Sequence, residues 1–132
     1  MKLFNKNTDY AARALMYLSK EKNRFVSSNE IADVVRIPLF YVRRILQKLT
    51  KNGILISREG IGGGVKLKKK PEVIRILDLI KIFQGDIKIS ECMFRKKICA
   101  ARSKCVLRVE IKKIENLVEQ KFGNITIKKL AA

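Results

Sequence analysis

Residues 27–53 constrain the fold most strongly, because their pattern predicts two short helices joined by a tight turn. Ser27 and Glu30 form a capping box, in which the Ser27 side chain satisfies the backbone N–H of Glu30 and the Glu30 side chain reaches back. Pro38 has the backbone angle of a first helical residue, and Gly53 is suited to the position after the last helical residue. We therefore predict a helix-turn-helix in this segment.

The second of these helices has an apolar side and a basic side, whereas the first is expected to turn Ile31, Val34 and Val35 inward. The apolar side consists of Val42, Ile45, Leu46 and Leu49. The outer side consists of Phe40, Arg44, Gln47 and Lys51, flanked by Arg43 and Lys48. Arginine can bind guanine and glutamine can bind adenine in the major groove of DNA. The pattern predicts a recognition helix, and a solvated charged face is the alternative.

A β-hairpin is predicted directly after this helix. Residues 54–58 and 65–68 read as strands, and the glycines between them tolerate the positive φ of a tight turn. A basic hairpin in this place is a wing, with Arg58 entering a minor groove and Lys66 reaching phosphates; a flexible loop is the alternative. The complete set of predicted DNA-binding residues is Ser28, Pro38, Phe40, Tyr41, Arg43, Arg44, Gln47, Lys48, Lys51, Arg58, Gly62, Gly63 and Lys66.

The remaining helices are read from their apolar periodicity. The first helix is expected to run to about Lys20 with Thr8 or Asn7 as its cap, and another to end at Gly85. A long helix from Val106 to about Phe122 is apolar although the core is already complete. Self-association would bury it, and packing on the first helix of the same chain is the alternative. Asn124 is expected to cap a last short turn.

The charge balance favours a polyanionic partner. The chain has 30 Lys and Arg against 12 Asp and Glu, a formal net charge of +18. Nucleic acid is the first candidate, an anionic membrane the second, and a lysine-rich composition the alternative. The absence of histidine removes the common catalytic triads and imidazole acid–base chemistry, so no enzyme is expected. No signal peptide or apolar stretch of about 20 residues is recognised, so we expect a cytoplasmic protein without membrane insertion.

Three cysteines lie in a strongly basic segment without periodicity. They are Cys92, Cys99 and Cys105, separated by six and five residues. Soft thiolates at this density form a plausible metal site, although the spacing is not that of zinc ribbons or ferredoxins. Buried structural thiols, or a redox-active pair with one spare thiol, are the alternatives. Because the chain has no histidine, a fourth ligand would be a carboxylate, a water or a small molecule.

These segments together resemble one known family. The segments are TDYAARALMYLSK, SSNEIADVVRIPLFYVRRILQKLTKNGIL, GIGGGVKL and ILDLIKIFQG, followed by the three cysteines. They resemble the Rrf2 family of bacterial regulators in the same order and over essentially the whole chain. The resemblance implies a mainly α fold with a small β-hairpin wing, and a homodimer joined through its long helix. It divides the chain into a winged helix-turn-helix domain at 1–85, a cysteine-bearing cluster loop at 86–105, and a dimerisation helix with a tail at 106–132.

The resemblance also implies an iron–sulfur cluster on the three cysteines. Family members of the IscR type place a histidine three residues after the last cysteine, where this chain has Arg108. Some members of the NsrR type use an aspartate in the first helix of the partner subunit, and Asp9 stands at the matching position. We therefore expect a 4Fe–4S cluster rather than a 2Fe–2S cluster, with Asp9 as fourth ligand and Glu91 in reserve. For Asp9, a plain helix-start acid is the alternative.

The function implied is a regulator, expected to be a repressor, that binds double-stranded operator DNA under control of the cluster. Nitric oxide, oxygen or iron shortage is the expected signal. The wing departs from the family, with Glu59 ahead of the glycines and Val65 in place of an aromatic residue. A cofactor-free or thiol-redox-responsive regulator, a zinc-stabilised binder and a small iron–sulfur electron carrier are the alternatives.

Overall fold

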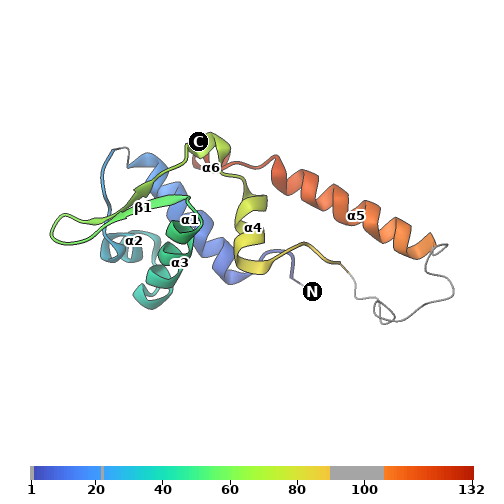
Figure 1. Ribbon diagram of the computed structural model, residues 1–132, viewed down its shortest axis with the longest axis horizontal. Helices are drawn as coiled ribbons and strands as arrows, with labels where there is room; N and C mark the ends of the chain where they lie inside the picture. The colour runs from blue at the N-terminus through green and yellow to red at the C-terminus, as the bar shows by residue number, and fades with distance from the viewer. Residues whose placement is uncertain (1, 22, 90–105) are drawn as a thin grey trace.

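The computed structural model describes residues 2–21, 23–89 and 106–132. Its elements are α1 (Lys6–Lys20), α2 (Ser28–Val35), α3 (Leu39–Lys51), β1 (Leu55–Arg58), β2 (Gly64–Leu67), a 3₁₀ turn (Pro71–Val73), α4 (Ile76–Gln84), α5 (Val106–Gly123) and α6 (Ile127–Ala131). Figure 1 shows a body made of α1–α4, α6 and the hairpin, from which α5 extends. The prediction of a mainly α fold with a small hairpin is confirmed.

The apolar side of α3 forms the centre of the body. Val42, Ile45, Leu46 and Leu49 are all buried, as predicted from their spacing. In α2, Ile31 is fully buried, but Val34 is 53% exposed, so its predicted inward position is wrong. The contact side of α2 runs over Ile31, Ala32 and Val35, which moves Val34 toward solvent.

The first helix begins earlier than expected. Asn5 caps α1, because its side chain accepts a hydrogen bond from the backbone N–H of Thr8 at 2.9 Å. The predicted caps, Asn7 and Thr8, are therefore wrong, and both residues lie within the helix. Thr8 is buried instead, and its hydroxyl donates to Oε1 of Gln84 at the end of α4. The hydrogen bond to Gln84, which is distant in sequence, thus explains why Thr8 is buried rather than serving as the helix cap.

The hairpin is attached to the body through the segment before α2. Strands β1 and β2 pair antiparallel, with Leu55 opposite Leu67. The backbone of Val26 exchanges hydrogen bonds of 2.8 and 2.9 Å with that of Val65. Gly64 lies at this crossing with a φ of +147°, and a Cβ there would lie 2.2 Å from the Val26 carbonyl oxygen. The wing is therefore held in place by a crossing that only glycine permits.

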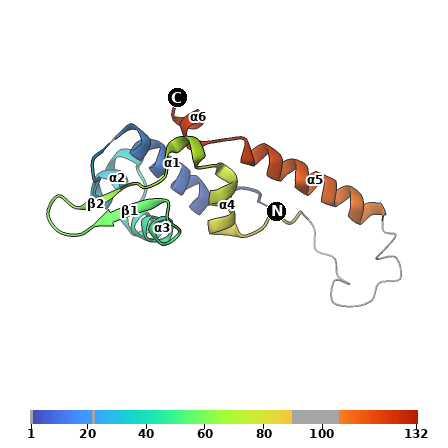
Figure 2. The same ribbon diagram turned by 45° about the horizontal axis from the view of Figure 1, so that its top comes forward.

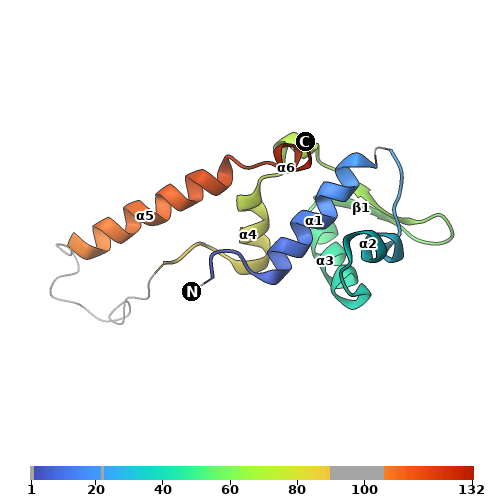
Figure 3. The ribbon, with the colours of Figure 1, turned by 180° about the vertical axis from the view of Figure 1, so that it is seen from behind.

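The C-terminal end returns to the body after α5. The backbone N–H of Ile127 donates to the carbonyl of Ile74 at 2.9 Å, and the Ile127 side chain is fully buried. Helix α6 packs against α1, and Figure 3 shows the two helices close together. Thr126 caps α6 by accepting from the backbone N–H of Lys129, so the predicted cap at Asn124 is wrong. None of the helices in the described residues has both the length and the apolar composition needed to cross a membrane.

Candidate nucleic-acid interface

The outer side of α3 presents the predicted recognition residues to solvent. Its exposed residues are Phe40, Arg43, Arg44, Gln47, Lys48 and Lys51. Phe40 is 64% exposed, and the Arg44 guanidinium lies 5.4 Å from the centre of its ring. Pro38 stands at the N-cap position, before the first helical residue rather than at it. Since the opposite side is buried in the core, the backbone of this basic surface is rigidly supported.

Tyr41 faces α1 rather than the outer side of α3. Its ring meets the ring of Tyr10 edge to face, with 5.8 Å between the ring centres. The Lys6 ammonium lies 4.5 Å from the Tyr41 ring centre and donates to its hydroxyl at 3.4 Å. Tyr41 therefore joins α3 to the beginning of α1, in addition to any contact with DNA.

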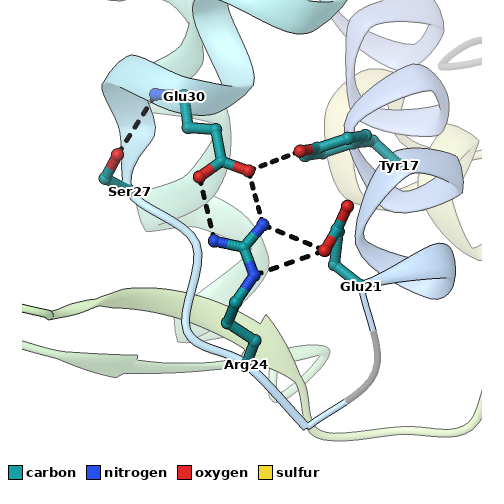
Figure 4. A network of polar contacts seen from close by, with 5 residues as sticks. All are labelled: Tyr17, Glu21, Arg24, Ser27 and Glu30. Atoms are coloured by element: carbon teal, nitrogen blue, oxygen red, sulfur yellow. Dashed lines mark hydrogen bonds and ion pairs between the residues drawn. The ribbon is translucent and has the colours of Figure 1, made fainter.

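A polar network fixes the N-terminus of α2, where Ser28 is the first helical residue. As predicted, the Ser27 hydroxyl accepts from the backbone N–H of Glu30 at 3.1 Å. The Glu30 carboxylate, expected to reach back to Ser27, instead accepts from Arg24 and from the Tyr17 hydroxyl (Figure 4). The local capping pattern could not indicate these partners, because both lie outside α2.

The network also balances the negative charge of its two carboxylates with a positive charge. Hydrogen bonds from Arg24, and then from Tyr17, lower the pKa of Glu30 to about 2. The same carboxylate raises the pKa of the Arg24 guanidinium and, through the hydrogen bond, that of Tyr17. Arg24 also pairs with Glu21 at 2.9 Å. Two carboxylates near the start of α2 are thus bound to one arginine, which reduces their repulsion of a phosphate there.

Two cations of the wing lie against the aromatic ring of Phe25, a residue that the sequence pattern did not indicate. The Arg58 guanidinium lies 4.2 Å, and the Lys66 ammonium 4.9 Å, from the centre of the Phe25 ring. Arg58 also donates to the carbonyl of Gly62 at 3.0 Å. Gly62 has a φ of +77°, and a Cβ on Gly63 would lie 2.2 Å from the Arg58 carbonyl oxygen. The glycines therefore close the turn, and the predicted contact of Gly62 and Gly63 with DNA stays a prediction.

The beginning of α1, where Asp9 lies, is joined to the end of α4. Gln84 Oε1 accepts from the backbone N–H of Asn5 at 2.9 Å and from the Thr8 hydroxyl at 2.6 Å. The Asp9 side chain is 41% exposed and accepts from Arg13 at 3.2 Å. Asp9 thus offers carboxylate oxygens at the surface, already paired with one cation.

The three cysteines lie outside the described residues. Cys92, Cys99 and Cys105, together with the reserve ligand Glu91, all belong to the segment 90–105. Within residues 2–21, 23–89 and 106–132, no three Asp, Glu or Cys side chains lie together in a way that could hold a metal ion. The predicted ligand set therefore stays a prediction.

Known proteins with similar sequences include transcriptional regulators, as expected for a basic, DNA-binding surface. The sequence profile of the Rrf2 family, described as iron-dependent transcriptional regulators, matches residues 4–132. The helix-turn-helix regulator NsrR of Bacillus licheniformis is 35% identical over 98 residues, which cover 74% of this chain and 68% of NsrR.

Two solved structures share the fold. CymR, the global cysteine regulator of B. subtilis, has a TM-score of 0.79 and 22% identity, covering 99% of this chain and 97% of CymR. IscR of T. potens has a TM-score of 0.75 and 21% identity, covering 98% and 85%. The family match spans nearly the whole chain, and the regulators share its winged helix-turn-helix. The chain therefore belongs to the Rrf2 family of DNA-binding transcriptional regulators.

Proposed function

We propose that the chain is a homodimeric repressor whose affinity for operator DNA is set by an iron–sulfur cluster on Cys92, Cys99 and Cys105. The observation that carries the DNA-binding part is the outer side of α3, which is basic and exposed while its other side is buried. The iron dependence in the family description and the three thiols support the cluster.

In this proposal α3 enters the major groove and the hairpin contacts the adjoining backbone. Arg43, Arg44 and Gln47 read base edges, because their side chains match the hydrogen-bonding edges of guanine and adenine. Lys48 and Lys51 bind phosphates and set the register on the duplex. Ser28, the first residue of α2, adds a hydroxyl at the N-terminus of that helix, and helix N-termini are suited to binding phosphate.

The dimer is proposed to form through α5. This helix has 18 residues, and two of its apolar side chains are exposed: Leu107 is 68% and Leu117 is 53% exposed. Figure 2 shows this helix extending from the body on the side away from the hairpin. A two-fold axis through α5 would cover both copies of this apolar side and present two recognition helices to a palindromic operator.

The cluster is proposed to be 4Fe–4S, held by the three cysteines of one subunit and Asp9 of the other. Thiolates suit iron–sulfur chemistry, and the exposed Asp9 carboxylate is free to move from Arg13 to a metal. When bound, the cluster supplies a centre sensitive to nitric oxide, oxygen and iron supply. The surrounding lysines and arginines would offset its negative charge.

Contacts within the body offer a route from the cysteine segment to α3. Gln84, just before that segment, binds Asn5 and Thr8 at the start of α1. Two residues after Thr8 in α1, Tyr10 packs on Tyr41 of α3. A change in the segment 86–105 would thereby alter how α1 supports the recognition helix. Allosteric control requires such a contact that differs between the two states of the protein.

The test is the iron and acid-labile sulfide content of protein purified without oxygen, with its visible absorption spectrum. We expect about four irons and four sulfides per chain, and loss of both in Cys99→Ala. Ser103→Ala, in the same segment, is the matched control and should retain the cluster. A colourless wild-type protein without iron, from a preparation protected throughout, would contradict the proposal of a cluster.

A second candidate function is a regulator that responds through thiol oxidation. The fold shared with CymR, described as a global cysteine regulator, and the basic surroundings of the cysteines favour it. Basic neighbours lower thiol pKa values and increase reactivity. This function requires an iron-free protein whose affinity for DNA changes reversibly with oxidant and reductant.

A further inference from the structure

We propose that Phe25 is a positioning residue for DNA binding: its ring holds Arg58 and Lys66 of the wing together as a phosphate-binding pair. The inference rests on the DNA-binding part of the proposed function. Phe25 lies outside both the recognition helix and the wing, so neither motif points to it.

The geometry places three side chains on one surface. The bridge between Val26 and Val65 sets Phe25 opposite Lys66 across the antiparallel crossing. The ammonium of Lys66 is 4.9 Å and the guanidinium of Arg58 is 4.2 Å from the centre of the Phe25 ring. Both distances lie within the roughly 6 Å at which a cation is attracted to an aromatic face.

The segment that carries Phe25 is fixed on both sides. The residue before it, Arg24, is bound to Glu21 and Glu30, as Figure 4 shows. The residue after it, Val26, is fully buried and paired with β2. The ring is therefore set in place before any ligand arrives, and so are the cations that rest on it.

Two cations on one ring repel each other, and this cost indicates an anionic ligand. Within the described part of the chain, neither Arg58 nor Lys66 forms an ion pair with a carboxylate. A backbone phosphate would satisfy both, since arginine offers a planar fork and lysine a point charge. Because the pair is preorganised, less side-chain freedom is lost when DNA binds.

The experiment measures binding of the full-length protein to a random-sequence 30-base-pair duplex by fluorescence anisotropy over a series of salt concentrations. Phe25→Leu removes the aromatic face and keeps an apolar side chain of similar bulk. We expect about three- to tenfold weaker binding at low salt. The slope of log affinity against log salt should fall by about 1–2, at about 0.9 per phosphate contact. Phe25→Tyr keeps an aromatic face and should have the affinity and the salt slope of the wild type.

Two further variants separate positioning from folding. Phe4→Leu is the matched control, because Phe4 stacks on Phe122 of α5, and it should leave the salt slope unchanged. Arg58→Gln should weaken binding less in the Phe25→Leu background than in the wild type, because the two residues act together.

A folded Phe25→Leu protein with wild-type affinity and salt slope would overturn the inference. So would equal losses in Phe25→Leu and Phe25→Tyr, since these would reflect side-chain packing alone. If the wild-type protein bound no duplex at all, the DNA-binding function itself would be refuted, and that outcome is distinct from a failure confined to Phe25.

Discussion

Helices α3 and α5 are both amphipathic, yet among residues 2–21, 23–89 and 106–132 only the apolar side of α3 is covered by the same chain. Leu49 of α3 is fully buried, whereas Leu117 of α5 is 53% exposed. The first packs among α1, α2 and β1, while α5 contacts mainly α4 and, through Phe122, Phe4. One helix is stabilised by the fold of the single chain, and the other presents apolar area that a second copy would bury.

The difference separates two requirements of a regulator of this kind. The body must hold the recognition side of α3 rigidly, and a complete core does this. In the proposed switch the distance between two recognition helices changes, and an arm outside the core is suited to that task. Substitutions in the two regions should therefore affect different measurements.

The largest expected effect comes from placing a charge on α5. Leu117→Asp should convert the dimer to monomer, because each copy loses burial of a leucine at a two-fold interface. Lost burial of the two half-exposed leucines, together with the cost of placing two carboxylates in the interface, gives an expected loss in dimerisation free energy of about 3–6 kcal/mol. Sedimentation equilibrium measures it. Asn116→Asp introduces the same charge at the neighbouring polar position and should remain dimeric; a dimeric Leu117→Asp protein would contradict this role of α5.

The next effect concerns the body. Leu49→Ala leaves a cavity in a fully buried site and should lower the free energy of unfolding by about 2–5 kcal/mol. Urea denaturation followed by circular dichroism measures it. Ile61→Ala is the control, since Ile61 is fully exposed on the wing and its truncation should change stability by less than about 0.5 kcal/mol. Equal effects at both sites would mean that α3 is not the centre of the core.

A smaller effect tests the outer side of α3. Arg44→Gln should cost about 1–3 kcal/mol in discrimination at one base pair. The measurement compares affinities for a duplex selected from a random pool and for its single-base-pair variants. Lys51→Gln is the control and should weaken all duplexes alike, as a phosphate contact does. A uniform loss in Arg44→Gln would assign Arg44 to the phosphate backbone as well.

The smallest effect is the pH dependence of the Glu30 network. The pKa of Glu30 is lowered to about 2 in the folded protein. Its stabilising contribution is therefore complete above the ordinary glutamate pKa of about 4.5 and is lost as the pH falls toward 2. At pH 6, Glu30→Gln should lower the free energy of unfolding by less than about 1 kcal/mol, which is seen as a slightly lower thermal midpoint. The difference from the wild type should vanish near pH 2.

Glu110→Gln, which removes a carboxylate from an exposed ion pair with Lys113 on α5, is the control for this titration. It should not reproduce the pH dependence of Glu30→Gln. A Glu30→Gln protein with an unchanged pH profile of stability would show that the network contributes nothing to the fold.

Local patterns predicted most of the body. The stripe from Val42 to Leu49, the Ser27 cap and the end of α4 at Gly85 each depend on residues within a few positions of one another. Such signals are readable because caps and helical periodicity act over one or two turns.

The errors and omissions share a cause in long-range contacts. Thr8 was expected to cap α1 but is buried against Gln84, 76 positions away. Glu30 was expected to turn back to Ser27 but binds Arg24 and Tyr17. Nothing near Phe25 in sequence indicates that two wing cations would rest on it. Pairings of this kind become visible only when the tertiary fold brings the segments together.

The most direct test of the account is the affinity for a selected DNA duplex, measured without oxygen before and after removal of the cluster. We predict that loss of the cluster, or the substitution Cys99→Ala, changes the affinity at least tenfold, a change of about 1.4 kcal/mol, while the protein stays folded. Equal affinity in the two states would contradict control by a cluster, and would leave the winged helix-turn-helix as a DNA-binding unit without that switch.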